Sequence, residues 1–256
     1  MISQSQLIQA LEAAGLSRGS TIFCHSNLAF FGAFENCKSI SAIAEMFFDS
    51  IIDVIGDEGN LVCPMFTYSF GSDKTEKVFD ISQNAHGMCP MGNLLLQKGI
   101  GVRSSDPMLS VLCFGKDQQR LAEFNEKICF GPNSIWAKLH ELDALICNFN
   151  FDSGSTFIHW VERELKVPYR QDVELKGTIK TLSESYHETV IYSGRDLNDV
   201  TSTAHFEEYH MRCLEARVSK KVPLGRGQIV TQRCQDGYTF IGRLLQSDPG
   251  ILTIGK

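Results

Sequence analysis

Short apolar runs alternate with segments of helical periodicity along most of the chain, and this alternation restricts the fold more than any other feature. The apolar runs predict buried strands and occupy residues 21–24, 60–63, 111–114 and 144–147. The helical segments occupy residues 3–15, 39–56, 91–97 and 135–141. Strands that alternate with helices are typical of an α/β fold, so we predict a mostly parallel central sheet flanked by helices.

The first helix carries the clearest boundary signals. Ser3 and Gln6 form a capping-box pattern, in which each side chain accepts a hydrogen bond from the other residue's backbone N–H. Ile2 and Leu7 are placed for the apolar contact that often accompanies such a cap, and Gly15 marks the end. These signals predict a helix that begins directly after Ser3.

The pattern changes after residue 170. A β-hairpin is predicted over 173–180 and 187–192, helices over 204–216 and 236–246, and a short strand over 228–231. The chain shows no internal repeat, low-complexity tract or linker. We therefore predict a single domain over residues 1–256, with a core at 1–170 and a hairpin and C-terminal region at 171–256.

Composition limits the functions that are open to this chain. Hydrophobic residues make up 43% of the sequence and charged residues 21%, which permits a large core and argues against disorder. The net charge of −6 argues against nucleic acid and anionic membranes as partners. No apolar run reaches the ~18 residues that a membrane helix requires.

The cysteines indicate a compartment. None of the nine cysteines forms a C-x-x-C pair, which argues against a zinc knuckle or a redox motif. The N-terminal residues lack the basic and apolar regions of a signal peptide. An odd number of cysteines without such a signal is typical of a reducing environment, so we expect a cytoplasmic protein.

Residues at the ends of the predicted strands are candidates for a ligand site, because parallel sheets bind ligands at the carboxyl ends of their strands. His25 and Ser26 follow the first strand, and residues 64–67 follow the second. The segment 65–87 mixes aromatic and acidic residues, which suits either a lid over a cationic substrate or a solvated loop. Arg103 beside hydroxyl side chains suits either a phosphate site or an ordinary turn.

The segment 154–165 follows the strand at 144–147 and carries the best candidate for catalysis. Ser155 or Thr156 is placed to cap a helix, and His159 and Glu162 lie three residues apart on one face of that helix. A histidine beside a carboxylate after a strand suits a general base. From the spacing alone, an ordinary polar helix face is the favoured interpretation.

Several common motifs are missing or incomplete. The chain contains neither a phosphate-binding G-x-x-x-x-G-K-S/T loop nor a G-x-S-x-G elbow. Gly225-Arg226-Gly227 lacks the third glycine of a dinucleotide fingerprint. Cys24 and His25 are adjacent on a strand and point to opposite faces, so they do not form a nucleophile–base pair.

Five segments in series resemble the motifs of one family, in the family's order and spacing. They are residues 25–32, 59–67, 103–115, 130–139 and 155–162, and the family is that of the aminoglycoside 3-N-acetyltransferases. The resemblance covers most of the chain up to about residue 170. Each motif is modest alone, but five in series are specific.

The resemblance implies transfer of an acetyl group from acetyl-CoA, without a metal, to an amine of an aminoglycoside or other amino sugar. It implies a fold distinct from that of the common small acetyltransferases. His159 would be the general base, which suits a side chain with a reference pKa of about 6.5. Glu162 would support it, and the Thr156 hydroxyl or a nearby backbone N–H would stabilise the oxyanion. The residues implied at the coenzyme A site are His25, Ser26, Asn27, Leu28, Phe66, Thr67, Arg103 and Ser104.

Asp106 departs from the family pattern, which has histidine before the following proline. A carboxylate is unfavourable beside a coenzyme phosphate, so this position either faces the substrate or weakens the grip on the coenzyme. The segment 167–170 and the hairpin after it resemble relatives thought to modify amino sugars of surface polysaccharides rather than antibiotics. A non-catalytic protein that binds a CoA thioester or a sugar, and a thiol or metal hydrolase, remain alternatives. The sequence does not predict an oligomeric state.

Overall fold

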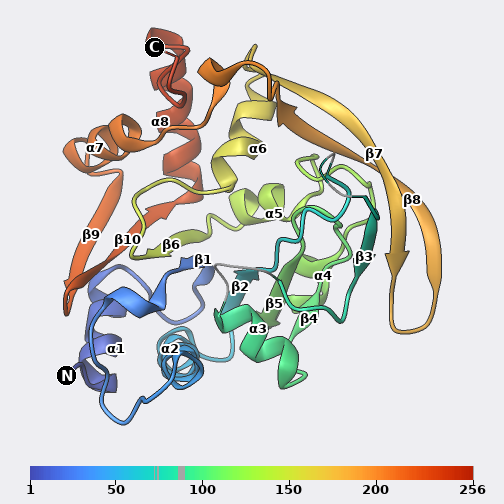
Figure 1. The fold of residues 1–256 in the computed structure, drawn as a ribbon. Coiled ribbons are helices and arrows are strands. Elements are labelled where there is room, and N and C mark those ends of the chain that lie inside the picture. The colour runs from blue at the N-terminus through green and yellow to red at the C-terminus, as the bar shows by residue number, and fades with distance from the viewer. Residues whose placement is uncertain (72, 74, 86–89, 256) are drawn as a thin grey trace.

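The computed structural model describes residues 1–71, 73, 75–85 and 90–255. These residues form three layers, with a seven-stranded sheet between two groups of helices (Figure 1). In spatial order the strands are β4 (Val102–Arg103), β5 (Val111–Gly115), β2 (Asn60–Pro64), β1 (Thr21–Ser26), β6 (Leu145–Phe149), β10 (Gly227–Arg233) and β9 (Ser219–Leu224). The predicted α/β fold with a helix-flanked central sheet is therefore confirmed.

The parallel part of the sheet is limited to its centre. β1 pairs in parallel with β2 and β6, whereas β5, β4, β10 and β9 join antiparallel. The expectation of a mostly parallel sheet holds for the three central strands and is corrected at both edges.

At one edge only Gly225 and Arg226 separate β9 from β10, and a two-residue turn can join only antiparallel neighbours. Gly225 has φ +57°, and a Cβ there would lie 2.4 Å from the carbonyl oxygen of Phe31, so this turn requires glycine.

Helices cover both faces of the sheet (Figure 1). One face carries α1 (Gln4–Ala13), α2 (Ile40–Ile55) and α3 (Pro90–Gln97). The other carries α4 (Gln118–Ala122), α5 (Ile135–Glu141), α6 (Phe157–Glu164) and α8 (Cys234–Ser247), and α7 (Glu207–Glu215) packs beside β9. The predicted capping box of Ser3 and Gln6 is present, and Ser39 caps α2. None of the described helices is long and apolar enough to span a membrane.

The central strands are buried on both faces, which explains their continuous apolar sequences. Along β1, Cys24 belongs to the core cluster of α1–α3, and Phe23 belongs to the cluster on the opposite face. The same alternation places Cys147 and Ile146 of β6 on opposite faces. The described cysteines are thiols rather than disulfide partners, and most of them fill core positions. His86 and Cys89 lie outside the described residues.

A second sheet, of three strands, lies beside the seven-stranded sheet (Figure 1). It consists of β3 (Val78–Asp80), β7 (Arg170–Lys180) and β8 (Ser185–Arg195), with β3 parallel to β7 and β7 antiparallel to β8. The predicted hairpin is confirmed. The strand β7 begins three residues earlier than predicted, and β8 extends beyond its predicted bounds at both ends. β3 comes from the segment 65–87, so part of that segment is a strand and not a free loop. Two 3₁₀ turns, η1 (Leu28–Phe30) and η2 (Val200–Ser202), complete the described structure.

Candidate active site

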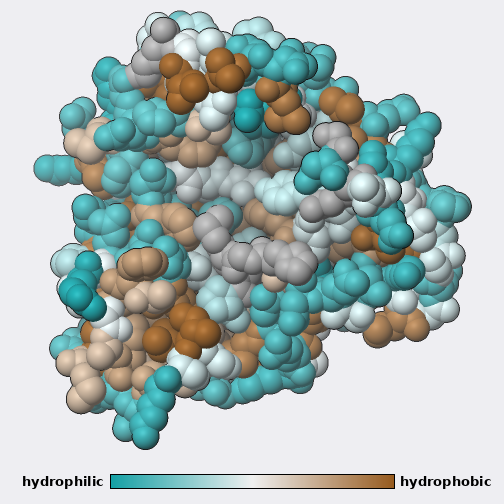
Figure 2. Space-filling view, in the orientation of Figure 1, coloured by the Kyte–Doolittle hydropathy of each residue, from teal (hydrophilic) through white to brown (hydrophobic). Residues whose placement is uncertain are grey.

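A cavity of about 840 Å³ lies where the central strands end and the β7–β8 hairpin begins. The carboxyl ends of β1 and β2 reach it, as predicted for a sheet with a parallel centre, and Thr156 of the loop between β6 and α6 also lines it. Figure 2 shows the surface hollowed near the middle of this view, with polar and apolar side chains mixed around the hollow. The residues that line the cavity are His25, Pro64, Phe66, Thr67, Tyr68, Gly71, Asp73, Ala85, Met108, Thr156, His159, Arg170, Val173, Leu175, Tyr192, Gly194, Arg195, Leu197 and Ala204.

His25 lies at the end of β1, opposite Asn148 of β6. Its ring packs edge-on against Phe23 and Phe66, with ring centroids 5.0 and 6.2 Å away. Its Nε2 accepts a hydrogen bond from the backbone N–H of Thr156, with the two nitrogens 3.4 Å apart. Burial, followed by the charge of His159, lowers the pKa of His25 to about 4, so the ring is neutral near pH 7.

The loop between β6 and α6 is fixed by its own side chains. Asn148 Nδ2 donates to the carbonyl oxygens of Asp152 and Gly154, at 2.7 and 2.8 Å. Gly154 packs against Phe206, where a Cβ would lie 2.5 Å from a ring carbon, so only glycine fits. Ser155 Oγ accepts from the N–H of Phe157 at 3.1 Å, which satisfies a free donor at the start of α6. Of the two predicted caps, the structure shows the contact at Ser155.

His159 and Glu162 form a hydrogen-bonded pair on α6. The His159 Nδ1 atom lies 2.7 Å from Glu162 Oε2, and the Glu162 side chain is 1% exposed. Burial raises the pKa of Glu162, but the hydrogen bond from His159 and the positive charges around it outweigh burial, and the net pKa is lowered. Burial also lowers the pKa of His159, so the pair consists of a neutral imidazole and a carboxylate near pH 7.

Two residues beyond α6 hold Glu162 from the other side. The Tyr169 hydroxyl donates to Oε1 at 3.0 Å, and Arg170 Nε donates to Oε2. Arg170 Nη1 also donates to the carbonyl oxygen of Ser193 on β8, at 2.9 Å. Arg170 therefore ties the carboxylate to the hairpin and lines the cavity itself. The sequence offers no signal for this role, because Arg170 lies on a strand and shares no helical spacing with Glu162.

Of the residues expected at the coenzyme site, some line a hollow of the protein and the others do not. Phe66 and Thr67 line the cavity with His25, whereas Asn27 lines a neighbouring hollow of about 370 Å³. That hollow also contains the side chains of Phe30, Asn150, Arg226 and Gln228. Leu28 is a core residue, and Ser26 is buried with no hydrogen-bond partner for its hydroxyl among the described residues.

Arg103 and Ser104 lie outside the lining of both hollows. The guanidinium of Arg103 donates to the carbonyl oxygens of Met65, Ile81 and Gln83, and it lies 5.1 Å from the ring centroid of Phe79. Ser104 Oγ accepts from the N–H of Val111 at 2.9 Å. In this structure both side chains are directed to the protein itself, and Arg103 fastens the segment that contains β3.

Asp106 is buried and does not line the cavity. Its Oδ1 accepts from the backbone N–H groups of Met108 and Leu109, at 2.8 and 3.0 Å, and from the thiol of Cys129 at 3.3 Å. Burial raises the pKa of this carboxyl group. The expectation that this position faces the substrate is therefore corrected: Asp106 holds the turn that places Met108 in the cavity wall.

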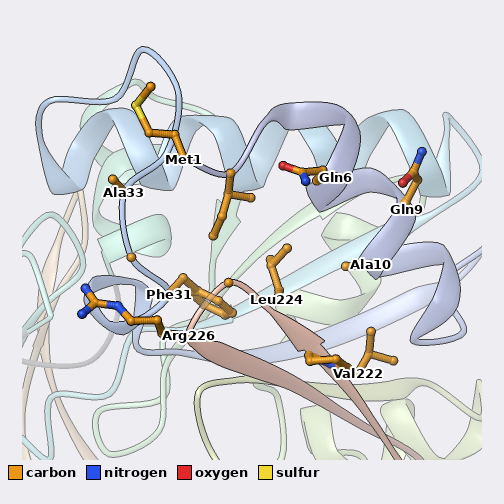
Figure 3. Close-up of a pocket in the computed structure, with 13 residues that line it drawn as sticks. Met1, Gln6, Gln9, Ala10, Phe31, Ala33, Val222, Leu224 and Arg226 are labelled. Carbon is orange, nitrogen blue, oxygen red and sulfur yellow. The ribbon is translucent and has the colours of Figure 1, made fainter.

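A further hollow of about 610 Å³ lies between α1 and the β9–β10 turn (Figure 3). Its described lining contains no histidine, cysteine or carboxylate. Arg226 is its charged side chain, and Figure 3 shows the guanidinium pointing away from Leu224 and Val222. The cavity at His159, by contrast, is lined by a histidine that is hydrogen-bonded to a buried carboxylate, and we take it as the candidate active site.

A histidine–carboxylate pair beside a cavity at the strand ends of an α/β sheet is an arrangement suited to proton transfer. The chain belongs to the aminoglycoside 3-N-acetyltransferase family, whose model matches residues 23–246, and the protein is therefore an acyltransferase.

Individual relatives agree with this membership. The SPbeta prophage-derived aminoglycoside N(3')-acetyltransferase-like protein YokD of Bacillus subtilis is 24% identical over 191 residues, which span 66% of this chain and 67% of that protein. Similar solved structures include aminoglycoside acetyltransferase AAC(3)-IIb, with a TM-score of 0.78 and 17% identity over 96% of this chain and 97% of that one.

Two further structures carry ligands of their own. AAC-IIIb, solved as a binary complex with CoASH, has a TM-score of 0.77 and 16% identity, over 96% of this chain and 97% of that one. AAC-VIa, solved with sisomicin, has a TM-score of 0.77 and 18% identity over the same shares of the two chains. At these identities the likeness shows a shared fold, and it confirms the predicted fold class.

Proposed function

We propose that the protein transfers the acetyl group of acetyl-CoA to an amine of an amino sugar, with His159 as the general base. The observation that carries this proposal is the His159–Glu162 pair on the cavity wall, with Nδ1 and Oε2 2.7 Å apart. Family membership and the CoASH and sisomicin bound by two relatives of the same fold support the choice of donor and acceptor.

His159 acts on the amine. A protonated amine has no lone pair, so a base must take its proton before nitrogen attacks the thioester carbon. In the proposed state Nδ1–H of His159 donates to Glu162, and Nε2 accepts the proton of the amine. Glu162 then stabilises the imidazolium that forms. A lowered pKa keeps His159 in its neutral form near pH 7, as this role requires.

Thr156 is the proposed donor to the oxyanion of the tetrahedral intermediate. The backbone N–H groups at the start of α6 already have acceptors: that of Thr156 donates to His25, that of Phe157 to Ser155 Oγ, and that of Ile158 to the carbonyl oxygen of Ser155. The Thr156 hydroxyl lines the cavity and lies 3.5 Å from His25 Nε2. These contacts favour the hydroxyl over a backbone N–H.

Collapse of the intermediate completes the transfer. The new bond joins the amine nitrogen to the acetyl carbon, and the bond between that carbon and the sulfur of coenzyme A breaks. The proton held by His159 passes to the departing sulfur, and the nitrogen releases its second surplus proton to solvent as the amide forms. His159 is then neutral for the next cycle.

Coenzyme A is proposed to lie along the residues that follow β1 and β2. His25, Phe66 and Thr67 on the cavity wall would contact its thioester end, and Asn27 in the neighbouring hollow would contact its remaining length. The guanidinium of Arg226 in that hollow fits a phosphate of the coenzyme. Leu28, Ser26, Arg103 and Ser104 are proposed to support this site from within the protein and not through contacts to the coenzyme.

Replacement of His159 by alanine tests the proposal. Thiol release from acetyl-CoA in the presence of an amino sugar is expected to fall by on the order of 10²–10⁴-fold, because the general base is removed. Calorimetric binding of acetyl-CoA is expected to change little. The matched control is His187→Ala, since His187 is an exposed histidine of β8 that does not line the cavity.

Two results contradict the proposal in different ways. A His159→Ala variant with full turnover removes His159 from its role as base. A wild-type protein that releases no thiol with any amino sugar contradicts acetyl transfer to this class of acceptor.

A further inference from the structure

The β7–β8 hairpin forms the cavity wall that lies away from the coenzyme residues. Its contribution to the lining includes Arg170, Val173, Leu175, Tyr192 and Arg195. Asn27 and Arg226, by contrast, lie in the hollow beside η1 and the β9–β10 turn, at the opposite side of the molecule from the hairpin (Figure 1). If the donor approaches from that side, the hairpin faces the acceptor.

Two arginines lie directly opposite one another in this wall. Arg170 of β7 pairs in register with Arg195 of β8. Like charges at directly opposed positions of an antiparallel pair repel each other and destabilise the pairing, unless another group neutralises one of the charges. Glu162 compensates the charge of Arg170 through its ion pair.

The charge of Arg195 has no such partner. Among the described residues no carboxylate lies within ion-pair distance of Arg195. Two carboxylates follow it in sequence, but Asp196 accepts from the N–H and side chain of Asn198, and Asp199 accepts from the N–H and hydroxyl of Thr201. The charge of Arg195 contributes to the lowered pKa of Asp199, but the two side chains form no ion pair, so the guanidinium at the cavity wall is not held by a carboxylate.

The described lining as a whole carries no excess of negative charge that would attract a polycation. It contains Arg170 and Arg195, and Asp73 is the one carboxylate among the described lining residues. His25 and His159 are neutral near pH 7 and add no negative charge. Because Glu162 already pairs with Arg170, an acceptor with several ammonium groups would find one carboxylate, Asp73, and the guanidinium of Arg195 in the same wall.

We propose that the acceptor is an amino sugar that carries a phosphate ester, as a sugar phosphate or a nucleoside diphosphate sugar, and that Arg195 binds its phosphate. The guanidinium fork matches the oxygens of a phosphate. Phe66, Tyr68 and Tyr192 supply aromatic faces for the sugar or an attached base. The cavity of about 840 Å³ leaves room for such a substituent. This inference rests on the proposed acetyl transfer.

Matched acceptor pairs test the inference. Hexoses with a free 2-, 3- or 4-amino group are assayed by thiol release, each as the free sugar, the 1-phosphate and the nucleoside diphosphate ester, with sisomicin as the polycationic acceptor. For the position that is acetylated, a phosphorylated form is expected to exceed both the free sugar and sisomicin in kcat/KM by about 10-fold or more. The two phosphorylated forms show which source of phosphate the site takes.

Variants assign the effect to one side chain. Arg195→Ala is expected to lower the preference for the phosphorylated over the free sugar by about 10-fold or more, and to raise KM for that acceptor more than KM for acetyl-CoA. Arg195→Lys should keep part of the preference, because it keeps the charge. Arg243→Ala is the control: it removes an exposed arginine of α8 that does not line the cavity, and it should leave the preference unchanged.

Several results would overturn the inference. The first is a wild-type enzyme that acetylates sisomicin or free amino sugars at least as well as the phosphorylated ones. The second is an Arg195→Ala variant that raises KM mainly for acetyl-CoA, which would assign Arg195 to the donor. In both cases the proposed acetyl transfer stands. Turnover of no acceptor at all would instead contradict the proposed function, and this inference with it.

Discussion

The Nδ1 atom of His159 lies within hydrogen-bond distance of two side chains that make opposite demands on it. Glu162 Oε2, at 2.7 Å, is an acceptor and favours a proton on Nδ1. Arg170 Nη2, at 2.6 Å, is a donor and favours a bare Nδ1, which would place the proton on Nε2. General-base catalysis requires the first arrangement. In the proposed mechanism, the ability of His159 to act as the base therefore depends on the balance between a carboxylate and a guanidinium, and not on the histidine alone.

Substitution of each partner is expected to move the acid limb of the pH profile in opposite directions. Activity requires neutral His159, so kcat/KM falls as pH drops through the pKa of this group. Glu162 raises that pKa, so Glu162→Gln should move the limb to lower pH, with kcat reduced by on the order of 10²-fold or more. Arg170 lowers that pKa, so Arg170→Gln should move the limb to higher pH. The measurement is kcat/KM between about pH 4.5 and 8.

Asp172→Asn is the control for these two variants. Asp172 pairs with Arg163 at 2.7 Å and does not line the cavity, so its loss should leave the limb in place. If the limb shifts in the same direction in both test variants, it does not report His159.

At the level of elements, sequence patterns predicted those helix and strand boundaries that depend on residues close together in the sequence. The caps at Ser3 and Ser39 follow from local hydrogen bonds, and each helix begins where its cap predicts. β3 and β9 were not predicted as strands. β3 has only three residues and pairs with a strand far along the chain, and β9 is an edge strand with exposed lysines and Pro223.

The candidate site divides in the same way. The shared helix face made His159 and Glu162 candidates, and the end of a strand did so for His25, but only the family resemblance favoured a catalytic role for the pair over an ordinary polar face. The inward direction of Arg103, the anchoring by Arg170 and the buried carboxylate of Asp106 depend on contacts between elements that no spacing encodes. Tyr169 and Arg170 were noted only as part of a segment, without a role.

Arg103 is expected to matter for stability rather than for coenzyme binding. Its guanidinium holds the backbone carbonyls of Met65, Ile81 and Gln83, so Arg103→Ala leaves those groups without their donor. The free energy of unfolding should fall by about 3 kcal/mol or more. Arg103→Lys should recover only part of this lost free energy, because lysine keeps a charged donor but its ammonium group cannot reproduce the planar fork of the guanidinium. Urea unfolding measures both.

Arg212→Ala provides the reference for this measurement. Arg212 forms a surface ion pair with Glu208 at 3.1 Å on α7, and its loss should change the free energy of unfolding by less than about 1 kcal/mol. A folded Arg103→Ala protein with wild-type stability and a much weaker affinity for acetyl-CoA would return Arg103 to the coenzyme site.

For the whole molecule, the half-buried His25 couples folding to pH. Its folded pKa of about 4 lies below the reference value of 6.5, so between these values the unfolded chain binds more protons than the folded protein. Its contribution is therefore fully present above about pH 6.5 and is lost as pH falls towards 4. Asp106, whose pKa is raised by burial, acts with the opposite sign. Acid should thus loosen the junction between the sheet and α6.

Comparison with a His25→Gln variant isolates this contribution. In the wild-type protein the free energy of unfolding should rise between pH 4 and 6.5, with a contribution from His25 of up to about 3 kcal/mol. The variant should lack that part of the rise and retain the effect of Asp106. Denaturant unfolding across this pH range measures the difference. Equal slopes in the two proteins would mean that His25 is not buried in a neutral form.

If the hairpin selects the acceptor as proposed, the pairing of β3 with β7 should affect how specificity is inherited. The hairpin that carries Arg170 and Arg195 rests on a strand encoded far upstream, and Arg103 fastens that strand to the rest of the protein. A recombination event between the codons for β3 and β7 would give the hairpin of one parent a foreign support. Specificity should therefore pass between genes only when both segments are exchanged together.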